Sequence, residues 1–444
     1  MDNCGEAPGE RELEIVPLGC IWTTPDGEGG GMRTGTNLPA IGGYNQAVVL
    51  DAIRRAEDGL SRVELAERTG LSAQTIGNVS RRLLDAGLVI ETGKIVNGPG
   101  KPRTILQLES RGSYAVGVHI DPAVITYVVL DLRGSIVSHS RTRTPSASQP
   151  DQVVDLMARS IDHLIDDSGV DRSLVLGVGI ASPGPIDADA GIVLDPPMLP
   201  RWQDVPLRAA LSEATGLPVL LEKDVTAAAV AELWFSSRNG RANFAFVYYG
   251  TGFGTGLVIN REAVRGASSN AGDAGHITVD AGGRVCICGR RGCVGDLITP
   301  RSLVRQAVEA GLLPLPPATE DDLLDLASIV SSLHRLAELA GSGDPAATKI
   351  LHDAGRHLAR AIVVIVNLLD LDEIVFGGPF WEEISGAILE VLPFAVESSE
   401  ALIPKHGLRF ERSAVGEDVA AVGAAVLVLD HAFSPRPSAM LISV

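Results

Sequence analysis

Three cysteines and one histidine stand close together in the second half of the chain, with a spacing typical of a metal site. They are His276, Cys286, Cys288 and Cys293. Thiolate and imidazole ligands suit Zn²⁺, and the glycines between them allow the tight turns of a closed tetrahedral site. Because four protein ligands leave no coordination position open, we predict a structural rather than a catalytic zinc. The alternative is three reduced surface cysteines beside an unrelated histidine.

Polar and basic residues that could bind DNA follow a helix-turn-helix pattern nearer the N-terminus. Ser61 with Glu64 three residues later predicts a capping box at the start of one helix. Gly70 then turns the chain, and Ser72 is a good cap for the next helix. Two short strands around a rigid basic turn follow. We therefore predict a winged helix-turn-helix at residues 44–110, with its second helix in the major groove.

The second helix of this segment presents short polar groups that can hydrogen-bond to base edges, and two arginines placed to meet phosphate. Two more basic residues stand by prolines in the wing and suit contact with the DNA backbone or minor groove. The candidate DNA-binding residues are Ser72, Gln74, Thr75, Asn78, Arg81, Arg82, Lys101 and Arg103. The alternative is a small helical interaction module that does not touch DNA.

The local charge of this segment supports the DNA-binding hypothesis, although the whole chain of 444 residues has a net charge of -18. Between Leu60 and Leu106, seven basic residues stand against four acidic ones, a local charge of +3. No apolar run reaches the roughly 18 residues that span a bilayer, and the acidic N-terminus is unlike a secretory signal. We expect a cytoplasmic protein without a membrane partner.

The length of the chain predicts more than one domain. Residues 1–43 are rich in glycine and proline, lack periodicity and predict a disordered tail. From residue 114 to 432, strand-like and helix-like segments alternate, which is typical of an α/β domain. Residues 433–444 form a short C-terminal tail.

Several motifs resemble those of the ROK family, which contains repressors and sugar kinases. The segments Gly272–His276 and Cys286–Cys293 resemble its signature, and Gly250–Gly256 resembles its second glycine-rich phosphate loop. The resemblance extends from Tyr44 onward, and the N-terminal winged helix is similar to the repressor branch that includes xylose repressors. It implies a two-lobed, actin-like and ribonuclease-H-like sugar-kinase-type domain that assembles as a homodimer or homotetramer.

Departures from the kinase pattern indicate that phosphoryl transfer is lost. A family kinase has D-x-G-G-T where this chain has His119 to Ala123, so histidine replaces the carboxylate and Pro122 replaces a glycine. Proline removes an N–H that could approach phosphate, and phosphoryl transfer depends on such positioning. We expect no enzyme activity. The alternative is a ROK-type kinase that phosphorylates a hexose with ATP.

The resemblance also implies a sugar site, with candidate ligand-binding residues Lys223, Asp224, Asp273 and His276. In the family the histidine touches both zinc and sugar, and Asp224 keeps the carboxylate of the family's Asn-Asp pair. Lys223 replaces the asparagine, which raises the hypothesis of a ligand with phosphate or carboxylate. The alternative is that Lys223 only pairs with Glu222 or Asp224.

Taken together, the residues predict a DNA-binding transcriptional regulator of carbohydrate-related genes, most simply a repressor. A sugar or sugar derivative would bias it between two states that differ in affinity for a double-stranded operator. A regulator without any small-molecule ligand, whose pocket serves only as scaffold, is a further alternative.

Overall fold

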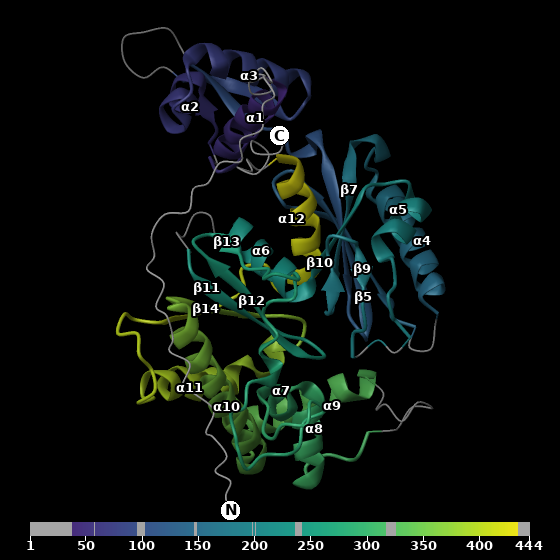
Figure 1. The fold of residues 1–444 in the computed structure, drawn as a ribbon, viewed down its shortest axis with the longest axis vertical. Coiled ribbons are helices and arrows are strands. Elements are labelled where there is room, and N and C mark those ends of the chain that lie inside the picture. The colour runs from purple at the N-terminus through teal and green to yellow at the C-terminus, as the bar shows by residue number, and fades with distance from the viewer. Residues whose placement is uncertain are drawn as a thin grey trace, which may run out of the picture.

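The computed structural model describes residues 38–56, 58–95, 103–145, 149–197, 199, 201–235, 242–316 and 326–433. In this part of the chain a small N-terminal domain is followed by two α/β lobes (Figure 1). The predicted tails fall almost wholly outside the described residues, and so does Lys101 in the wing. No described helix is both long and apolar enough to cross a membrane.

The N-terminal domain has the predicted winged-helix layout of three helices and a three-stranded sheet. Its elements are α1 (Leu38–Arg54), β1 (Leu60–Ser61), α2 (Arg62–Thr69), α3 (Ala73–Asp85), β2 (Val89–Ile95) and β3 (Arg103–Leu108). The strands are antiparallel in the order β1-β3-β2. Helix α1 starts before the expected position near Tyr44, and both wing strands are longer than their apolar runs suggested.

Local signals account for the helix ends of this domain. The Ser61 N–H donates to Glu64 Oε2 over 2.8 Å, and the Glu64 N–H donates to Ser61 Oγ, which completes the predicted capping box. Gly70 ends α2 in the left-handed conformation with φ of 70°, where a Cβ would be strained. Ser72 caps α3, as predicted.

The first lobe is a five-stranded sheet in the order β10-β7-β4-β5-β6. The edge strand β10 and its neighbours β7 and β4 are parallel to one another. Strands β5 and β6 continue the sheet as an antiparallel meander. Helices α4 and α5 cover one face. The elements are β4 (Tyr114–Ile120), β5 (Val124–Asp131), β6 (Ile136–Arg143), α4 (Pro150–Ser168), β7 (Val175–Ser182), α5 (Leu207–Thr215) and β10 (Val219–Lys223).

The second lobe is a five-stranded sheet in the order β13-β12-β11-β14-β15. This is the order of the first sheet when that sheet is read from its other edge, as β6-β5-β4-β7-β10. The repeated order confirms the predicted two-lobed architecture. Its strands are β11 (Phe244–Tyr249), β12 (Phe253–Ile259), β13 (Glu262–Ala263), β14 (Glu373–Gly377) and β15 (Arg409–Arg412). Its helices are α7 (Val294–Ile298), α8 (Pro300–Glu309), α9 (Leu326–Gly341), α10 (Pro345–Leu369) and α11 (Trp381–Glu397).

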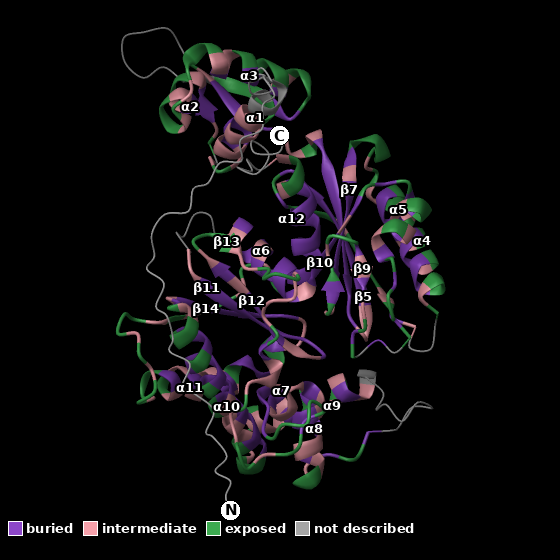
Figure 2. Cartoon of the chain, in the orientation of Figure 1, coloured by how far each residue is buried: buried purple, intermediate pink, exposed green. Residues whose placement is uncertain are grey.

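Two helices join the lobes: α6 (Asp224–Phe235), which follows β10 directly, and α12 (Val419–Phe433), which returns to the first sheet. Both are buried on nearly all sides (Figure 2). They cross closely, because a Cβ on Gly423 would lie 1.9 Å from the carbonyl oxygen of Ala227. A bulkier residue at this crossing would force the helices apart.

Candidate functional site

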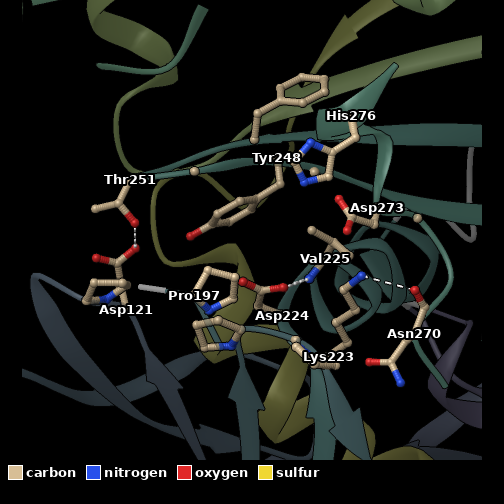
Figure 3. Close-up of a pocket in the computed structure, with 18 residues that line it drawn as sticks. Asp121, Pro197, Lys223, Asp224, Val225, Tyr248, Thr251, Asn270, Asp273 and His276 are labelled. Carbon is tan, nitrogen blue, oxygen red and sulfur yellow. Dashed lines mark hydrogen bonds between the residues drawn. The ribbon is translucent and has the colours of Figure 1, made fainter. Parts of the chain in front are cut away.

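A pocket of about 350 Å³ lies between the two lobes (Figure 3). Its walls come from the turn after β4, the end of β10, the start of α6, the β11–β12 turn and the segment before the predicted metal ligands. The four residues predicted from the sequence to bind a ligand all line it, namely Lys223, Asp224, Asp273 and His276. The fold therefore gathers residues from both lobes around one cavity.

Asp121 and Thr251 connect the two turns that face each other across this pocket. The Thr251 hydroxyl donates a hydrogen bond of 2.9 Å to Asp121 Oδ2, and the second carboxylate oxygen accepts the Ala123 N–H over 2.8 Å. Burial raises the pKa of Asp121 to about 6 despite these hydrogen bonds. A carboxylate thus stands between two turns that the family resemblance associates with phosphate.

The position of Asp121 modifies the expectation that this turn has lost its carboxylate. His119 does occupy the kinase aspartate's position, but it is a buried residue of β4 outside the pocket lining, and burial lowers its pKa to about 4. Asp121, two residues on, is the side chain that reaches the pocket. The motif did not point to Asp121, because this residue stands where the kinase motif has a glycine. Asp121 follows the last residue of β4, and the turn there brings its side chain to the pocket.

Tyr248 forms part of the pocket wall and was not expected from the sequence. It is 4% exposed, and its ring makes an edge contact with His119 at 6.0 Å between centroids. Among the described residues, none hydrogen-bonds to its hydroxyl. Burial and the nearby carboxylates of Asp121 and Asp224 raise the pKa of this phenol well above its usual value, so it stays protonated. The hydroxyl is a buried donor that a bound molecule could satisfy.

Lys223 is held by backbone carbonyl groups rather than by the carboxylates that the sequence suggested. Its Nζ donates to the carbonyl oxygens of Asn270 and Ala271 over 3.2 and 3.3 Å. Glu222 instead accepts a 2.6 Å hydrogen bond from Arg265. Asn270 is itself fixed, since its side chain both accepts from the Ile186 N–H and donates to the Ile186 carbonyl. The ammonium group is therefore tied to the segment that leads to Asp273.

Asp224 and Asp273 contribute two further carboxylates (Figure 3). Asp224 is the first residue of α6 and accepts the Val225 N–H over 2.7 Å. Burial raises its pKa to about 6, and the positive charge of Lys223 only partly opposes this. Asp273 is exposed to the cavity and lies beside His276 in the view of the pocket.

The four predicted metal ligands come together behind the pocket. One ligand atom from each of His276, Cys286, Cys288 and Cys293 lies within 4.8 Å of the other three. His276 Nδ1 is 3.5 Å from Cys286 Sγ, and the sulfurs of Cys288 and Cys293 are 3.6 Å apart. A tetrahedral zinc with Zn–S bonds of about 2.3 Å separates its sulfur ligands by about 3.8 Å, so the donor set fits this ion. His276 belongs both to this cluster and to the pocket wall.

The outer face of α3 carries most of the predicted DNA-binding residues. Gln74, Asn78, Arg81 and Arg82 are exposed, while Ile76, Val79 and Leu83 on the opposite face are buried. The Ser72 hydroxyl is used as the helix cap, because it accepts the Thr75 N–H and contacts Thr75 Oγ1 at 2.9 Å. Ser72 and Thr75 thus shape the helix start, whereas the four exposed residues are free to reach a groove. In the wing, Arg103 is exposed as the first residue of β3.

The winged helix packs onto the two-lobed domain through α1. The Arg54 guanidinium carbon lies 3.8 Å from the centre of the Trp234 ring near the end of α6, and Arg54 also donates to Asp51 over 2.8 Å. Leu50, Leu429 and Phe433 line a small cavity beside this contact. This interface was not predictable from local patterns, since Arg54 and Trp234 are 180 residues apart.

Both parts of the chain match family models. Residues 115–431 match the model described as ROK family, and residues 43–93 match the model described as MarR family. The first match covers well over half of the chain. The chain belongs to the ROK family. This confirms the resemblance seen in the sequence motifs and the winged-helix fold of the N-terminal domain.

The relatives include both repressors and kinases. The chain is 26% identical over 394 residues to the xylose repressor of Bacillus subtilis, covering 87% of this chain and 95% of the repressor. It is 27% identical over 319 residues to a glucokinase of Halalkalibacterium halodurans, covering 70% of this chain and 94% of the kinase. The crystal structure of a ROK family transcriptional regulator, a homologue of the E. coli MLC protein, superposes with a TM-score of 0.73 at 24% identity, covering 91% and 98% of the two chains. The alignments with the repressor and the regulator thus extend over more of this chain than the kinase alignment does.

Proposed function

We propose that this ROK-family chain is a DNA-binding repressor of carbohydrate-related genes whose interlobe pocket binds a sugar or sugar derivative. Gln74, Asn78, Arg81 and Arg82 would contact the operator, with Ser72 and Thr75 at the helix start and Lys101 and Arg103 in the wing. Lys223, Asp224, Asp273 and His276 would contact the effector. The full-length similarity to a xylose repressor supports the DNA-binding half of this proposal.

One structural observation carries the proposal: a single helix connects the pocket to the winged helix. Helix α6 begins at Asp224, which lines the pocket, and its residue Trp234 lies under Arg54 of α1. Because a helix rises 1.5 Å per residue, these ten residues span about 15 Å of rigid backbone. A ligand that shifts the start of α6 would therefore displace the surface on which the DNA-binding domain rests.

We further propose that His276, Cys286, Cys288 and Cys293 hold a structural Zn²⁺. The donor atoms and their separations suit this ion, and a bound zinc would fix the wall of the pocket that contains His276. Such a repressor would bind its operator as a homodimer or homotetramer, since a two-fold assembly presents two recognition helices to two half-sites.

A hexose kinase is the second candidate, and the pocket carboxylates are the observation that favours it. Asp224 would be the group that accepts a proton from a sugar hydroxyl in such an enzyme. Against this, Pro122 has no N–H for phosphate, and the carboxylate of Asp121 stands between the two turns. We expect no ADP release above background when the protein is mixed with ATP, Mg²⁺ and common hexoses; turnover would establish the kinase instead.

The test of the main proposal is recovery of bound DNA from cells, followed by footprinting of the purified full-length protein on that DNA. We expect one or a few operators near carbohydrate genes, and protection that weakens when the correct sugar is added. Binding without sequence preference would contradict the proposal, as would protection that no sugar in a broad panel alters.

A further inference from the structure

The pocket is rich in hydrogen-bond acceptors. Three carboxylates line it among the described residues, from Asp121, Asp224 and Asp273, against one ammonium group from Lys223. Lys223 already donates to two carbonyl oxygens, which uses two of its three N–H bonds. With three carboxylates against one ammonium group, the charge that faces a ligand is negative.

The position at which a phosphate would be expected is the least favourable for one. The turns after β4 and between β11 and β12 are joined by the Asp121–Thr251 hydrogen bond, so a carboxylate lies between them. Pro122 next to it offers no N–H. An anionic group here would meet a buried negative charge, and at short range such repulsion is weakly screened.

Tyr248 supplies a second and independent observation. Its hydroxyl is buried and without a hydrogen-bond partner among the described residues, and Figure 3 shows it directed between Asp121 and Asp224. A buried hydroxyl without a partner destabilises a protein unless a ligand or water completes it. A ligand hydroxyl placed here could accept from Tyr248 while donating to one of the carboxylates.

We propose that the pocket takes a sugar or polyol without an anionic group, recognised through its hydroxyl hydrogens by Asp121, Asp224 and Tyr248. This rests on the proposed function, namely that the pocket binds the effector. Lys223 raised the hypothesis of a ligand with phosphate or carboxylate. In the present proposal the ammonium group instead orders the Asn270–Ala271 segment and does not bind a phosphorylated sugar.

Calorimetry on the full-length protein tests the ligand class. The probes are D-xylose, D-glucose, D-glucosamine and N-acetyl-D-glucosamine, each paired with its own phosphate ester. We expect at least one unmodified sugar to bind and its phosphate to bind at least tenfold more weakly. A phosphate ester that binds as tightly as its parent or more tightly would overturn the ligand class while leaving the sugar-responsive repressor intact. Failure of every probe in both series would overturn the ligand class together with the proposed sugar response.

Three variants connect the result to the residues. Tyr248→Phe removes only the unpartnered hydroxyl, so affinity for the sugar should fall five- to tenfold with little change in Tm. Tyr249→Phe is the matched control: its hydroxyl donates to the Ile298 carbonyl outside the pocket, so it should lower Tm and leave sugar affinity unchanged. Asp121→Asn should reduce the ratio of the affinity for the parent sugar to the affinity for its phosphate ester, because the substitution removes the charge that repels the phosphate. An unchanged preference in Asp121→Asn, or unchanged affinity in Tyr248→Phe, would contradict the assignment.

Discussion

The guanidinium carbon of Arg54 lies 3.8 Å above the centre of the Trp234 indole ring, which joins the DNA-binding domain to the helix that begins at the pocket. Arg54 is largely shielded from solvent, and burial lowers its pKa although Asp51 opposes this effect. A cation–π contact contributes about 0.5–2 kcal/mol, more where the cation is desolvated. This contact is large enough to bias two arrangements of the domains, whose coupling free energy is typically about 1–3 kcal/mol.

Replacing Trp234 should therefore weaken communication between sugar and DNA. In Trp234→Leu we expect the ratio of operator affinities without and with saturating sugar to shrink by a factor of about 2–30, while the sugar itself still binds. Fluorescence anisotropy with labelled operator measures both affinities. Arg55→Ala is the matched control, since Arg55 shares the partner Asp51 but is more exposed and is not the residue stacked on Trp234. An unchanged ratio in Trp234→Leu would assign the coupling to another contact.

The arginines on α3 should act on all DNA sequences alike. Because each phosphate contact releases counterions, Arg81→Ala with Arg82→Ala should weaken binding uniformly and reduce the slope of log affinity against log salt by about 1–2. A salt titration between roughly 50 and 200 mM measures this slope. Arg335→Ala, an exposed arginine of α9, should leave it unchanged. If the slope of the double variant equals that of the wild type, these arginines do not contact phosphate.

Gln74 and Asn78 should instead affect the choice of sequence. Amide side chains pair with adenine edges, and a good pair discriminates against the wrong base by about 1–3 kcal/mol. In Gln74→Ala and Asn78→Ala we expect affinity for the operator to approach that for random DNA, with the salt slope retained. Competition between operator and random duplexes provides the measurement. Equal losses on both duplexes would place these side chains on the backbone rather than on bases.

Features fixed by neighbouring residues were predictable from the sequence. The capping box of Ser61 and Glu64 needs residues three apart, and the Cys286–Cys293 cluster needs one hairpin. Helix α12 was not predicted, because a helix buried on all sides is apolar throughout and shows no amphipathic period.

The pocket could be predicted only where a motif marked it. Asp224 and Asp273 stood in recognised motifs, whereas Asp121 and Thr251 meet across 130 residues and Tyr248 has no local signature. The hydrogen-bond partners of Lys223 were not predictable either, because they include the backbone carbonyl of Asn270, whose direction does not follow from the residue type. Long-range placement, rather than the chemistry of single residues, was the missing information.

Removing a metal ligand should affect both zinc content and the pocket. In Cys288→Ser we expect zinc to fall well below the roughly one equivalent per chain that a four-ligand site holds, and Tm to fall with it. Sugar affinity should also decrease, because His276 would lose the ion that orients it. Elemental analysis and calorimetry provide the two readouts, and His334→Gln, an exposed change outside the cluster, is the control. Full zinc content in Cys288→Ser would show that the metal is held elsewhere.

The stability of the protein should depend on pH through Asp121. Its pKa is raised to about 6 in the folded chain from an ordinary value of 3.8, chiefly by burial, and burial raises the pKa of Asp224 in the same pocket to about 6 as well. Between about pH 4 and pH 6 the unfolded chain loses this proton first, so the free energy of unfolding falls as pH rises and levels off above the folded pKa. The full effect is on the order of 3 kcal/mol per group. Asn cannot ionise, and it keeps both contacts if its Oδ1 accepts the Ala123 N–H and its NH2 group donates to the Thr251 hydroxyl. We therefore expect Asp121→Asn to be more stable than the wild type at pH 7.5 and nearly equal to it at pH 4.5. Thermal unfolding at both pH values measures the difference, and Asp189→Asn, an exposed change outside the pocket, should shift neither. If Asp121→Asn is less stable than the wild type at pH 7.5, the charged carboxylate of Asp121 stabilises the folded protein, contrary to this prediction.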